Sequence, residues 1–432
     1  LPELQRSPLD ELCLQVKLLE RRGFAEAASA ETFLAKAAEP PPPAAVSNAL
    51  RLLEAIGAIT PPAEEGDTQQ QKQRGERLTT LGRHLAALPL APAVGKLVLY
   101  GVLFRCLDPV LTVACCLAYR DPWVLPVDPT LRRTAAGVKL ALSDRAGGCS
   151  DHLAVAAAYE AWAAARSSGG GGGGGGDRAF ASRNFLSPGT MAMIDGMRSQ
   201  LLQELRGRGL VGSRSLPNAS ASARDAAVVR CALACGLYPN AGRLLPANSP
   251  DANGNFHAAQ QRKGAAIATR KDDKVRVHAS SVNSNLRPPP PPPLSKESGS
   301  GGKPLHPCPL VVFDELTRSE SSLYVRQTTA VGAHPLLFVA ERVSRRPPKP
   351  AKRAKLNDDG DGGRREIDDI DEENLPSGSD SDSDSEDEED PSPVLVVDDW
   401  LPLRVPAGAE LPLLVLRQRI EACFAHLVER PG

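Results

Sequence analysis

Hydrophobic residues recur at helical spacing through one long stretch of the chain, LTTLGRHLAALPLAPAVGKLVLYGVLFRCLDPVLTVACCLAY (78–119). Apolar positions three and four residues apart predict buried helix faces. Thr79 or Thr80 is placed to cap a first short helix, and Pro92 to begin a second one. The pair Asp108-Pro109 is expected to cap and start a third helix, which is apolar on nearly every side. The pattern therefore predicts a helical bundle.

The residues before this bundle predict three helices and a hairpin. Amphipathic segments follow Ser7-Pro8 and the proline run 40–43, with a shorter segment at 31–38 between them. Gly57 is placed to stop the third helix. Two short runs are expected to pair as strands: 58–60 and 77–79. The polar residues between the strands have the composition of a disordered insertion. Three helices and a hairpin are typical of a winged helix, although the bare pattern is common.

Two more amphipathic helices are predicted further along, at 150–162 and 184–211. Asp151 is expected to cap the first of them. The neighbouring residues Ser150-Asp151-His152 have the composition of a hydrolase triad, but three sequential residues do not normally converge on one proton path. In the second helix Arg198 is predicted to lie off the apolar stripe, where it can face a nucleic-acid backbone.

The second half of the chain has more β-type patterns. Residues 225–238 predict a helix that leads into a strand, and a polar insertion is expected over 243–273. Residues 274–286 predict a strand and a turn, and three later runs predict strands: 310–316, 322–331 and 335–340. Several short strands after a bundle indicate a small barrel. Apolar positions over 413–427 predict a last amphipathic helix.

Composition indicates that much of the length is insertion. The chain has 37 glycines and 39 prolines, and only 4% of its residues are aromatic. Residues 167–178 are rich in glycine, and 344–393 form a basic and then acidic segment that is expected to be disordered. Seventeen acidic residues against two arginines give 358–390 a charge of −15, and the total is −1, so the remainder carries +14. A basic body suits either a polyanion-binding protein or a solvated charged surface.

Several protein classes are disfavoured. No apolar run reaches the roughly 18 residues of a membrane span, and the N-terminus lacks the regions of a signal peptide. The nine cysteines are scattered without a CxxC pair, and Cys231 and Cys235 have no further zinc ligands nearby. We therefore expect an intracellular protein, cytoplasmic or nuclear, that is not secreted and holds no metal. Because the chain begins without Met, we also expect it to be part of a longer protein.

The stretch from 78 to 124, which ends in RDPWV, resembles the start of the helicase-associated ratchet domain of DEAH-box (DEAH/RHA) RNA helicases. SPLDELCLQVKLLE and FLAKAAEPPPPAAVSNALRLLEAIGAI resemble the winged helix of this family, and SDHLA resembles a segment of its ratchet. The order GLYPN, VRVHASSVNSN, LVVFDEL, YVRQTTAV and LLFVA is similar to its OB-fold. The resemblance implies a multidomain α+β chain with four parts: a winged helix at 1–79, a helical ratchet at 80–212, an OB-fold-like β-barrel with a C-terminal helix at 225–343 and 394–432, and the insertion at 344–393.

The same resemblance implies a function. The chain would be the RNA-binding C-terminal region of an ATP-dependent helicase, and would grip single-stranded RNA while motor domains, in cis or in trans, hydrolyse ATP with Mg²⁺. The sequence contains neither GxxxxGK[ST] nor a DEAH box. This chain alone is therefore expected to be inactive as an ATPase, with no catalytic, cofactor-binding or metal-binding residue of its own.

The expected RNA contacts lie in the ASSVNSN turn, on the predicted strand 322–331 and on the predicted helix 184–211. They are Ser280, Ser281, Asn283, Arg326, Thr328 and Arg198. In this sequence Ala279 stands where the family often has proline, so a looser turn is expected. The alternative is a stand-alone, non-catalytic module: an RNA-binding adaptor or a ribonucleoprotein scaffold with other partners. A Walker A lysine and a DEAH box encoded upstream would distinguish the helicase from the adaptor.

Overall fold

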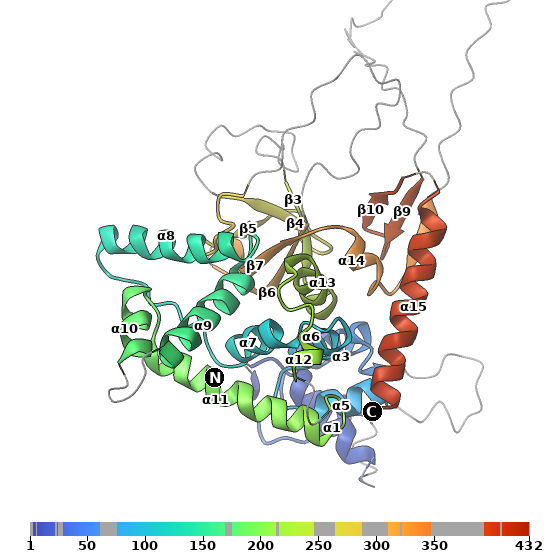
Figure 1. Ribbon diagram of the computed structural model, residues 1–432. Coiled ribbons are helices and arrows are strands. Elements are labelled where there is room, and N and C mark those ends of the chain that lie inside the picture. The colour runs from blue at the N-terminus through green and yellow to red at the C-terminus, as the bar shows by residue number, and fades with distance from the viewer. Residues whose placement is uncertain are drawn as a thin grey trace, which may run out of the picture.

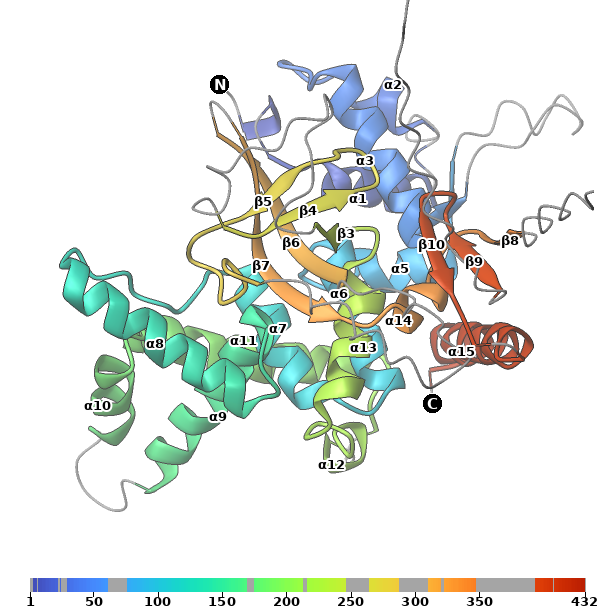
Figure 2. The ribbon, with the colours of Figure 1, turned by 90° about the horizontal axis from the view of Figure 1, so that it is seen from above.

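The computed structural model describes residues 3–5, 7–21, 24, 29–60, 76–168, 175–212, 216–245, 264–286, 310–319, 322–346, 393–406 and 408–431. Most of the helices lie in the lower half of the molecule in Figure 1, with a small β-barrel above them. The barrel stands between helices α8 (Pro129–Arg145) and α9 (Asp151–Ser168) on one side and helix α15 (Glu410–Glu429) on the other (Figures 1 and 2). The fold is therefore α+β, as predicted.

The N-terminal part is a group of short helices closed by a two-stranded hairpin. Its elements are a 3₁₀ helix η1 (Glu3–Gln5), α1 (Asp10–Arg21), α2 (Ala30–Leu34), α3 (Pro43–Ile56), β1 (Ile59–Thr60) and β2 (Arg77–Leu78). Gly57 ends α3 with a φ of 82°, a left-handed conformation that glycine adopts without the strain of a Cβ. Thr60 and Arg77 are antiparallel partners, which confirms the predicted hairpin. The insertion predicted between the strands, at 61–75, lies outside the described residues.

The predicted stretch 78–119 forms three helices. They are α5 (Thr80–Ala86), α6 (Pro92–Leu103) and α7 (Leu107–Ala118). Thr79 caps α5, because its Oγ1 accepts a hydrogen bond from the Gly82 N–H at 2.9 Å. The prediction that Asp108 caps α7 was wrong: the helix begins at Leu107, and the Asp108 carboxylate in its first turn is 2.6 Å from an Arg198 nitrogen.

Among the described residues the bundle continues with six helices, two of which are α8 and α9. The others are α10 (Gly176–Arg183), α11 (Pro188–Gly207), α12 (Leu216–Ala219) and α13 (Ala226–Leu237). Ser187 caps α11 through a hydrogen bond from the Thr190 N–H at 3.3 Å, as Ser187-Pro188 in the sequence favours. Trp162 of α9 is buried in an apolar cluster between α8, α10 and α11. Within the predicted glycine-rich insertion 167–178, residues 169–174 lie outside the described residues.

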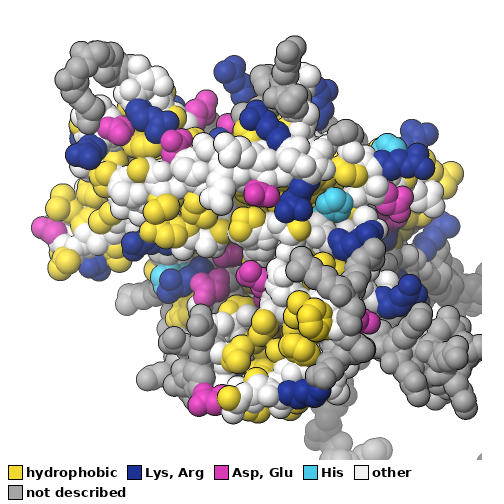
Figure 3. Space-filling view, turned by 90° about the horizontal axis from the view of Figure 1, so that it is seen from below, with side chains coloured by type: hydrophobic (Ala, Val, Ile, Leu, Met, Phe, Trp, Pro, Cys, Tyr) yellow, Lys and Arg dark blue, Asp and Glu magenta, His cyan; other side chains and the backbone are white. Residues whose placement is uncertain are grey.

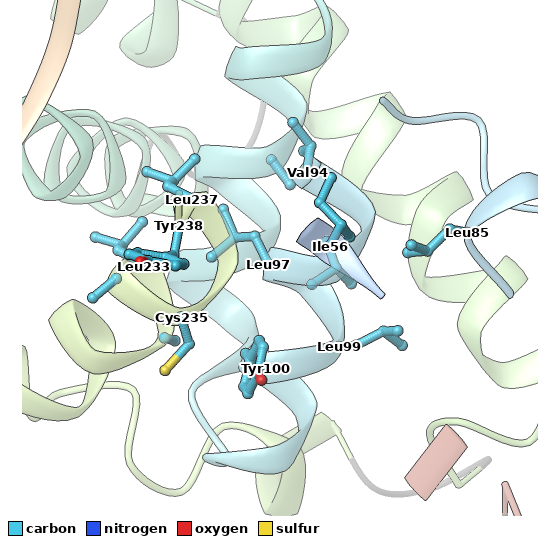
Figure 4. Close-up of a cluster of buried hydrophobic side chains, with 14 of the residues drawn as sticks. Ile56, Leu85, Val94, Leu97, Leu99, Tyr100, Leu233, Cys235, Leu237 and Tyr238 are labelled. Carbon is cyan, nitrogen blue, oxygen red and sulfur yellow. The ribbon is translucent and has the colours of Figure 1, made fainter. Parts of the chain in front are cut away.

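Helices α6 and α13 pack closely against each other in the main apolar core (Figure 4). A Cβ on Gly236 would lie 2.4 Å from the Leu97 Cα, so only glycine allows the two backbones to come so close. Leu97, Leu233 and Leu237 fill the space around this contact and are almost fully buried. The large apolar core therefore joins the early bundle to the helix that leads into the barrel.

Five strands close into a barrel in the order β3-β4-β5-β7-β6 (Figure 2). They are β3 (Ala241–Leu244), β4 (Ala266–Thr269), β5 (Val275–Val277), β6 (Leu310–Arg318) and β7 (Leu323–Val331). Only β5 and β7 pair in parallel among these neighbours. Their inward side chains form a small apolar core of their own, which includes Ile267, Val311 and Val325.

Two predictions about the barrel were wrong. Strand β4 lies inside 243–273, which we predicted to be a polar insertion. Its AIAT sequence is short and weakly alternating, so the pattern gave little sign of it. Conversely, the predicted strand 335–340 begins inside helix α14 (His334–Leu337). Pro335 sits in the first turn of α14, where its missing N–H costs nothing.

The last elements form a separate sheet and a long helix. Strands β8 (Val343–Arg346), β9 (Val394–Val397) and β10 (Leu401–Arg404) make a three-stranded antiparallel sheet. Helix α15 then packs against α5 and α6, and Phe424 stacks on Tyr100 with 4.4 Å between ring centroids. Strand β8 thus reaches three residues into the range 344–393 that we assigned to an insertion, and 347–392 lie outside the described residues.

Candidate nucleic-acid interface

The N-terminus of α9 is one of the places where the helical bundle meets the barrel. Ser150, Asp151 and His152 are all buried there. The Ser150 Oγ accepts a hydrogen bond from the Leu153 N–H at 3.0 Å, so Ser150 caps the helix. The prediction that Asp151 is the cap was wrong, because the Asp151 side chain points to the barrel instead.

The Asp151 carboxylate collects donors from the bundle and from the barrel. The Lys139 ammonium of α8 lies 2.7 Å from its Oδ1. Oδ1 also accepts from the Val282 N–H at 3.0 Å, while Oδ2 accepts from the Ser281 hydroxyl at 2.5 Å and from the Thr328 N–H at 2.9 Å. A single buried carboxylate therefore joins α8, the turn after β5 and strand β7.

The turn after β5 is held by further polar contacts on the same side. The Asn283 amide donates to the Thr328 Oγ1 at 2.9 Å and to the Cys149 carbonyl at 3.1 Å. The Ser281 hydroxyl lies 2.8 Å from the Thr328 Oγ1. Lys139 donates to the Ser280 carbonyl at 3.0 Å. We call this set of residues the joint: Lys139, Ser150, Asp151, His152, Ser281, Asn283, Thr328 and Thr329.

His152 and Thr329 extend the joint along β7. The His152 Nδ1 lies 2.7 Å from the Thr329 Oγ1, which in turn lies 2.6 Å from the Ser150 Oγ. Neighbouring side chains of a regular strand point to opposite faces, yet Thr328 and Thr329 are both fully buried against α9. Gln327, just before them, has a left-handed φ of 49°, which interrupts the regular strand at this point.

Burial and charge set the protonation of the joint. Burial alone would raise the pKa of Asp151, but the Lys139 ammonium and the hydrogen bonds from Ser281 and Thr328 hold that pKa below its ordinary value. Burial lowers the pKa of His152 to about 4, with a further push from Lys139, although the Asp151 charge opposes both effects. At neutral pH the joint thus holds an ionised Asp151 carboxylate and a neutral His152 imidazole.

The six predicted RNA-contact residues do not all lie in the same environment. Ser281, Asn283 and Thr328 come together in the joint, where their side chains are buried and bonded to other parts of the chain. Ser280 and Arg326 are exposed. RNA contact by any of them stays a prediction, and the exposed pair is the part of the set that is directly open to a ligand.

Arg198 lies apart from the other five. It is buried on the apolar side of α11, so the prediction that it lies off the stripe was wrong. Its guanidinium donates to the Asp108 carboxylate and to the Asp108 carbonyl, both at 2.6 Å, and to the Thr112 hydroxyl at 2.5 Å. The guanidinium carbon also lies 4.3 Å from the centre of the Tyr159 ring. These contacts tie α11 to α7 and α9, which is the role the structure assigns to this side chain.

An aromatic pair lies beside the exposed contact residues. The His278 and Tyr324 rings meet edge to face, with centroids 6.0 Å apart, and both are half-buried. Burial lowers the pKa of His278, and the nearby Arg326 and Lys139 charges lower it further.

The hairpin of β4 and β5 adds exposed basic side chains: Arg270, Lys271 and Lys274. On the face seen from below in Figure 3, by contrast, basic and acidic side chains are intermixed.

Sequence reasoning missed Lys139, His278 and Tyr324, and it considered His152 only as part of a hydrolase triad. The SDHLA motif pointed to the right segment, but the chemistry of its Asp depends on a turn more than a hundred residues away. Within the described parts of the chain, no group of three His, Cys, Asp or Glu side chains is arranged to hold a metal ion. In those same parts, no helix is long and apolar enough to cross a membrane.

Three family matches follow the order of these parts. Residues 49–90 match the winged-helix part of the helicase-associated domain, and residues 91–155 match its ratchet-like part. Residues 229–343 match an oligonucleotide/oligosaccharide-binding (OB)-fold. The third match spans the barrel and ends at the start of β8.

The relatives to which the chain is similar are also helicases. The chain is 34% identical over 445 residues to the DExH-box ATP-dependent RNA helicase DExH6 of Arabidopsis thaliana, a match that covers 100% of the chain and 30% of that protein. It is 31% identical over 433 residues to DExH2 of the same plant, covering 100% of the chain and 24% of that helicase. It is 34% identical over 285 residues to the human ATP-dependent DNA/RNA helicase DHX36, covering 66% of the chain and 25% of that protein. The chain therefore spans between about a quarter and a third of the length of these relatives.

Proposed function

Since this chain corresponds to the C-terminal region of DExH-box RNA helicases, we propose that it grips single-stranded RNA for a helicase motor. ATP and Mg²⁺ would bind in motor domains outside these 432 residues, joined to the chain in cis or supplied in trans. Other ribonucleoprotein partners and an intracellular location, cytoplasmic or nuclear, belong to the same proposal.

The observation that carries the proposal is the exposed group beside the joint. Ser280 and Arg326 offer a hydroxyl and a guanidinium, which suit phosphate and sugar oxygens. The half-buried Tyr324 and His278 rings offer a surface on which a base can stack, and such stacking tolerates any sequence. The basic side chains of the β4–β5 hairpin lie on the same barrel. This combination of charge and aromatic surface is what OB-fold proteins use for single strands.

The test is a binding titration of the 432-residue chain with a fluorescently labelled single-stranded uridine oligonucleotide. We expect binding at low salt that weakens steeply between about 50 and 200 mM salt, because phosphate contacts release counterions. Arg326→Ala and Ser280→Ala should each weaken binding, and Arg326→Ala should also reduce the salt dependence. The affinity of Arg198→Ala, measured under conditions in which this variant is folded, tests whether the buried Arg198 contributes to RNA binding.

Arg419→Ala is the matched control, since Arg419 is exposed on α15, away from the barrel. It removes the same charge and should leave the affinity within about two-fold of the wild type. Equal losses from Arg326→Ala and Arg419→Ala would mean that only net charge matters, and would contradict the proposed interface. A wild-type chain that does not bind at low salt would contradict the proposed function itself.

A further inference from the structure

The turn at 278–286 has little apolar anchoring of its own. Apart from Val282 and Leu286, which are only half-buried, its residues are polar or small. Local backbone hydrogen bonds fold it, such as Ser281 N–H to His278 carbonyl at 3.0 Å and Ser284 N–H to Ser281 carbonyl at 3.1 Å. Such bonds define a turn but do not fix how it sits on the barrel. Its position must come from contacts to other elements.

The barrel supplies some of those contacts, such as the Ala265 N–H to the Ser284 carbonyl at 2.6 Å and the Asn283 amide to Thr328 Oγ1 at 2.9 Å. Two charged residues of the helical bundle supply further contacts, to residues 280–282. Lys139 donates to the Ser280 carbonyl, and Asp151 accepts from the Ser281 hydroxyl and the Val282 N–H. The two charges lie 2.7 Å apart, so each compensates for the burial of the other. Three successive turn residues are thus held by one ion pair that belongs to a different part of the chain.

The exposed side chain of Ser280 lies at the outer edge of this arrangement. Its carbonyl points inward to Lys139, while its hydroxyl lies 2.7 Å from the His278 Nδ1. The backbone contact on one side therefore determines where the hydroxyl and the neighbouring imidazole lie on the other.

We propose that Lys139 and Asp151 are positioning residues, which hold the turn so that Ser280 and His278 meet single-stranded RNA in a fixed geometry. This inference rests on the proposed function. It also assigns a role to three predicted contact residues: Ser281, Asn283 and Thr328 act through the turn, because their side chains are engaged in the joint. The RNA-binding surface of the barrel is then complete only when the barrel is docked on α8 and α9.

The experiment compares Asp151→Asn with the wild type in the 432-residue chain. Hydrogen exchange measured by mass spectrometry reports on the turn, and the uridine oligonucleotide titration reports on binding. We expect at least ten-fold faster exchange in peptides covering 278–286, and at least ten-fold weaker binding at equal folded fraction. Exchange in α11 should stay unchanged. Lys139→Met should shift both readouts in the same direction.

Asp195→Asn is the matched control. Asp195 pairs with Arg166 at 2.8 Å and accepts from Tyr159, but both partners lie within the bundle. The same isosteric loss of charge should leave the turn and the affinity unchanged. If Asp151→Asn does not fold, Ser281→Ala removes one contact to the same carboxylate and carries the same expectation.

A double variant separates positioning from general loss of stability. If Asp151 acts through Ser280, then Ser280→Ala added to Asp151→Asn should weaken binding by less than two-fold beyond the single variant. Fully additive losses, an unchanged exchange rate in the turn, or wild-type affinity in Asp151→Asn would each overturn the inference. A wild-type chain without affinity for the oligonucleotide would instead overturn the proposed function, and this inference with it.

Discussion

Burial of His152 makes the folded chain sensitive to acid. Its pKa falls from about 6.5 to about 4 on folding, so the unfolded chain takes up a proton in this range while the folded chain does not. Stability is therefore lost as the pH falls from about 6.5 towards 4. With about 1.4 kcal/mol for each unit of pKa difference, this residue accounts for roughly 3 kcal/mol of that loss.

His152→Gln should remove most of this dependence. Between pH 7 and pH 4.5, urea unfolding followed by circular dichroism should show the wild type losing about 2–3 kcal/mol more than the variant. Thr329→Val is the control, because it removes the hydrogen bond to the imidazole and leaves the imidazole in place. It should keep the wild-type response to pH. Equal losses in His152→Gln and the wild type would mean that this side chain does not titrate as its burial requires.

Single residues also show where sequence reasoning stops. Arg198 was placed off the apolar stripe because arginine is charged, yet it lies on the stripe with Met191, Ile194 and Leu201. Its charge is matched by Asp108, ninety residues away, and a distant partner of this kind leaves no local pattern. Asp151 was assigned the wrong role for the same reason. A polar residue at a helix start suggests a cap, and only the fold shows that its partners are on a barrel strand.

At the scale of elements, helix starts and stops were the most predictable features. Thr79 and Pro92 begin helices as expected, because caps and prolines act within one turn of the chain. The barrel was harder to predict. The run PLLFVA is apolar enough for a strand or a helix, so the pattern alone does not distinguish the two. In the structure its first residues belong to helix α14. Strand β4 is identified by its pairing with β3 and β5, since its own four residues carry almost no signal.

The close packing of α6 against α13 predicts that two helical glycines respond differently to substitution by alanine. In Gly236→Ala the new methyl group would lie 2.4 Å from the Leu97 Cα and 2.5 Å from its Cβ, so the helices would have to separate. Overpacking of this kind should cost about 1–3 kcal/mol of folding free energy. Gly196 of α11 has no atom within 4 Å of an added Cβ, and Gly196→Ala should stabilise the chain by about 0.5–1 kcal/mol.

Thermal unfolding of both glycine variants measures the contrast, since the chemical change is identical and both residues lie in helices. We expect a lower Tm for Gly236→Ala and an equal or higher Tm for Gly196→Ala. A neutral Gly236→Ala would show that the two backbones can move apart freely, and would contradict the close packing at the centre of the core.

For the whole molecule, the two ends of the segment 347–392 are brought together by the sheet. Arg346 of β8 and Val394 of β9 are direct partners in the antiparallel ladder, so a short loop can join them. The segment holds seventeen acidic and six basic residues, and its removal would change the formal net charge of the chain from −1 to +10. The two points at which this acidic segment joins the described sheet are therefore adjacent.

Replacing 347–392 by a linker of about three residues should therefore leave the fold intact and strengthen RNA binding. Each halving of loop length lowers the closure cost by roughly 0.6 kcal/mol, so the Tm should stay equal or rise. The affinity for the uridine oligonucleotide at low salt should increase, because a long-range repulsion between like charges is removed, and the gain should shrink as salt is added. A second variant, which keeps the length but replaces the acidic residues by glycine and serine, separates charge from length. If charge is the cause, this variant should match the shortened chain in affinity but not in stability. Unchanged affinity in both variants would mean that the acidic residues do not act on the RNA-binding surface.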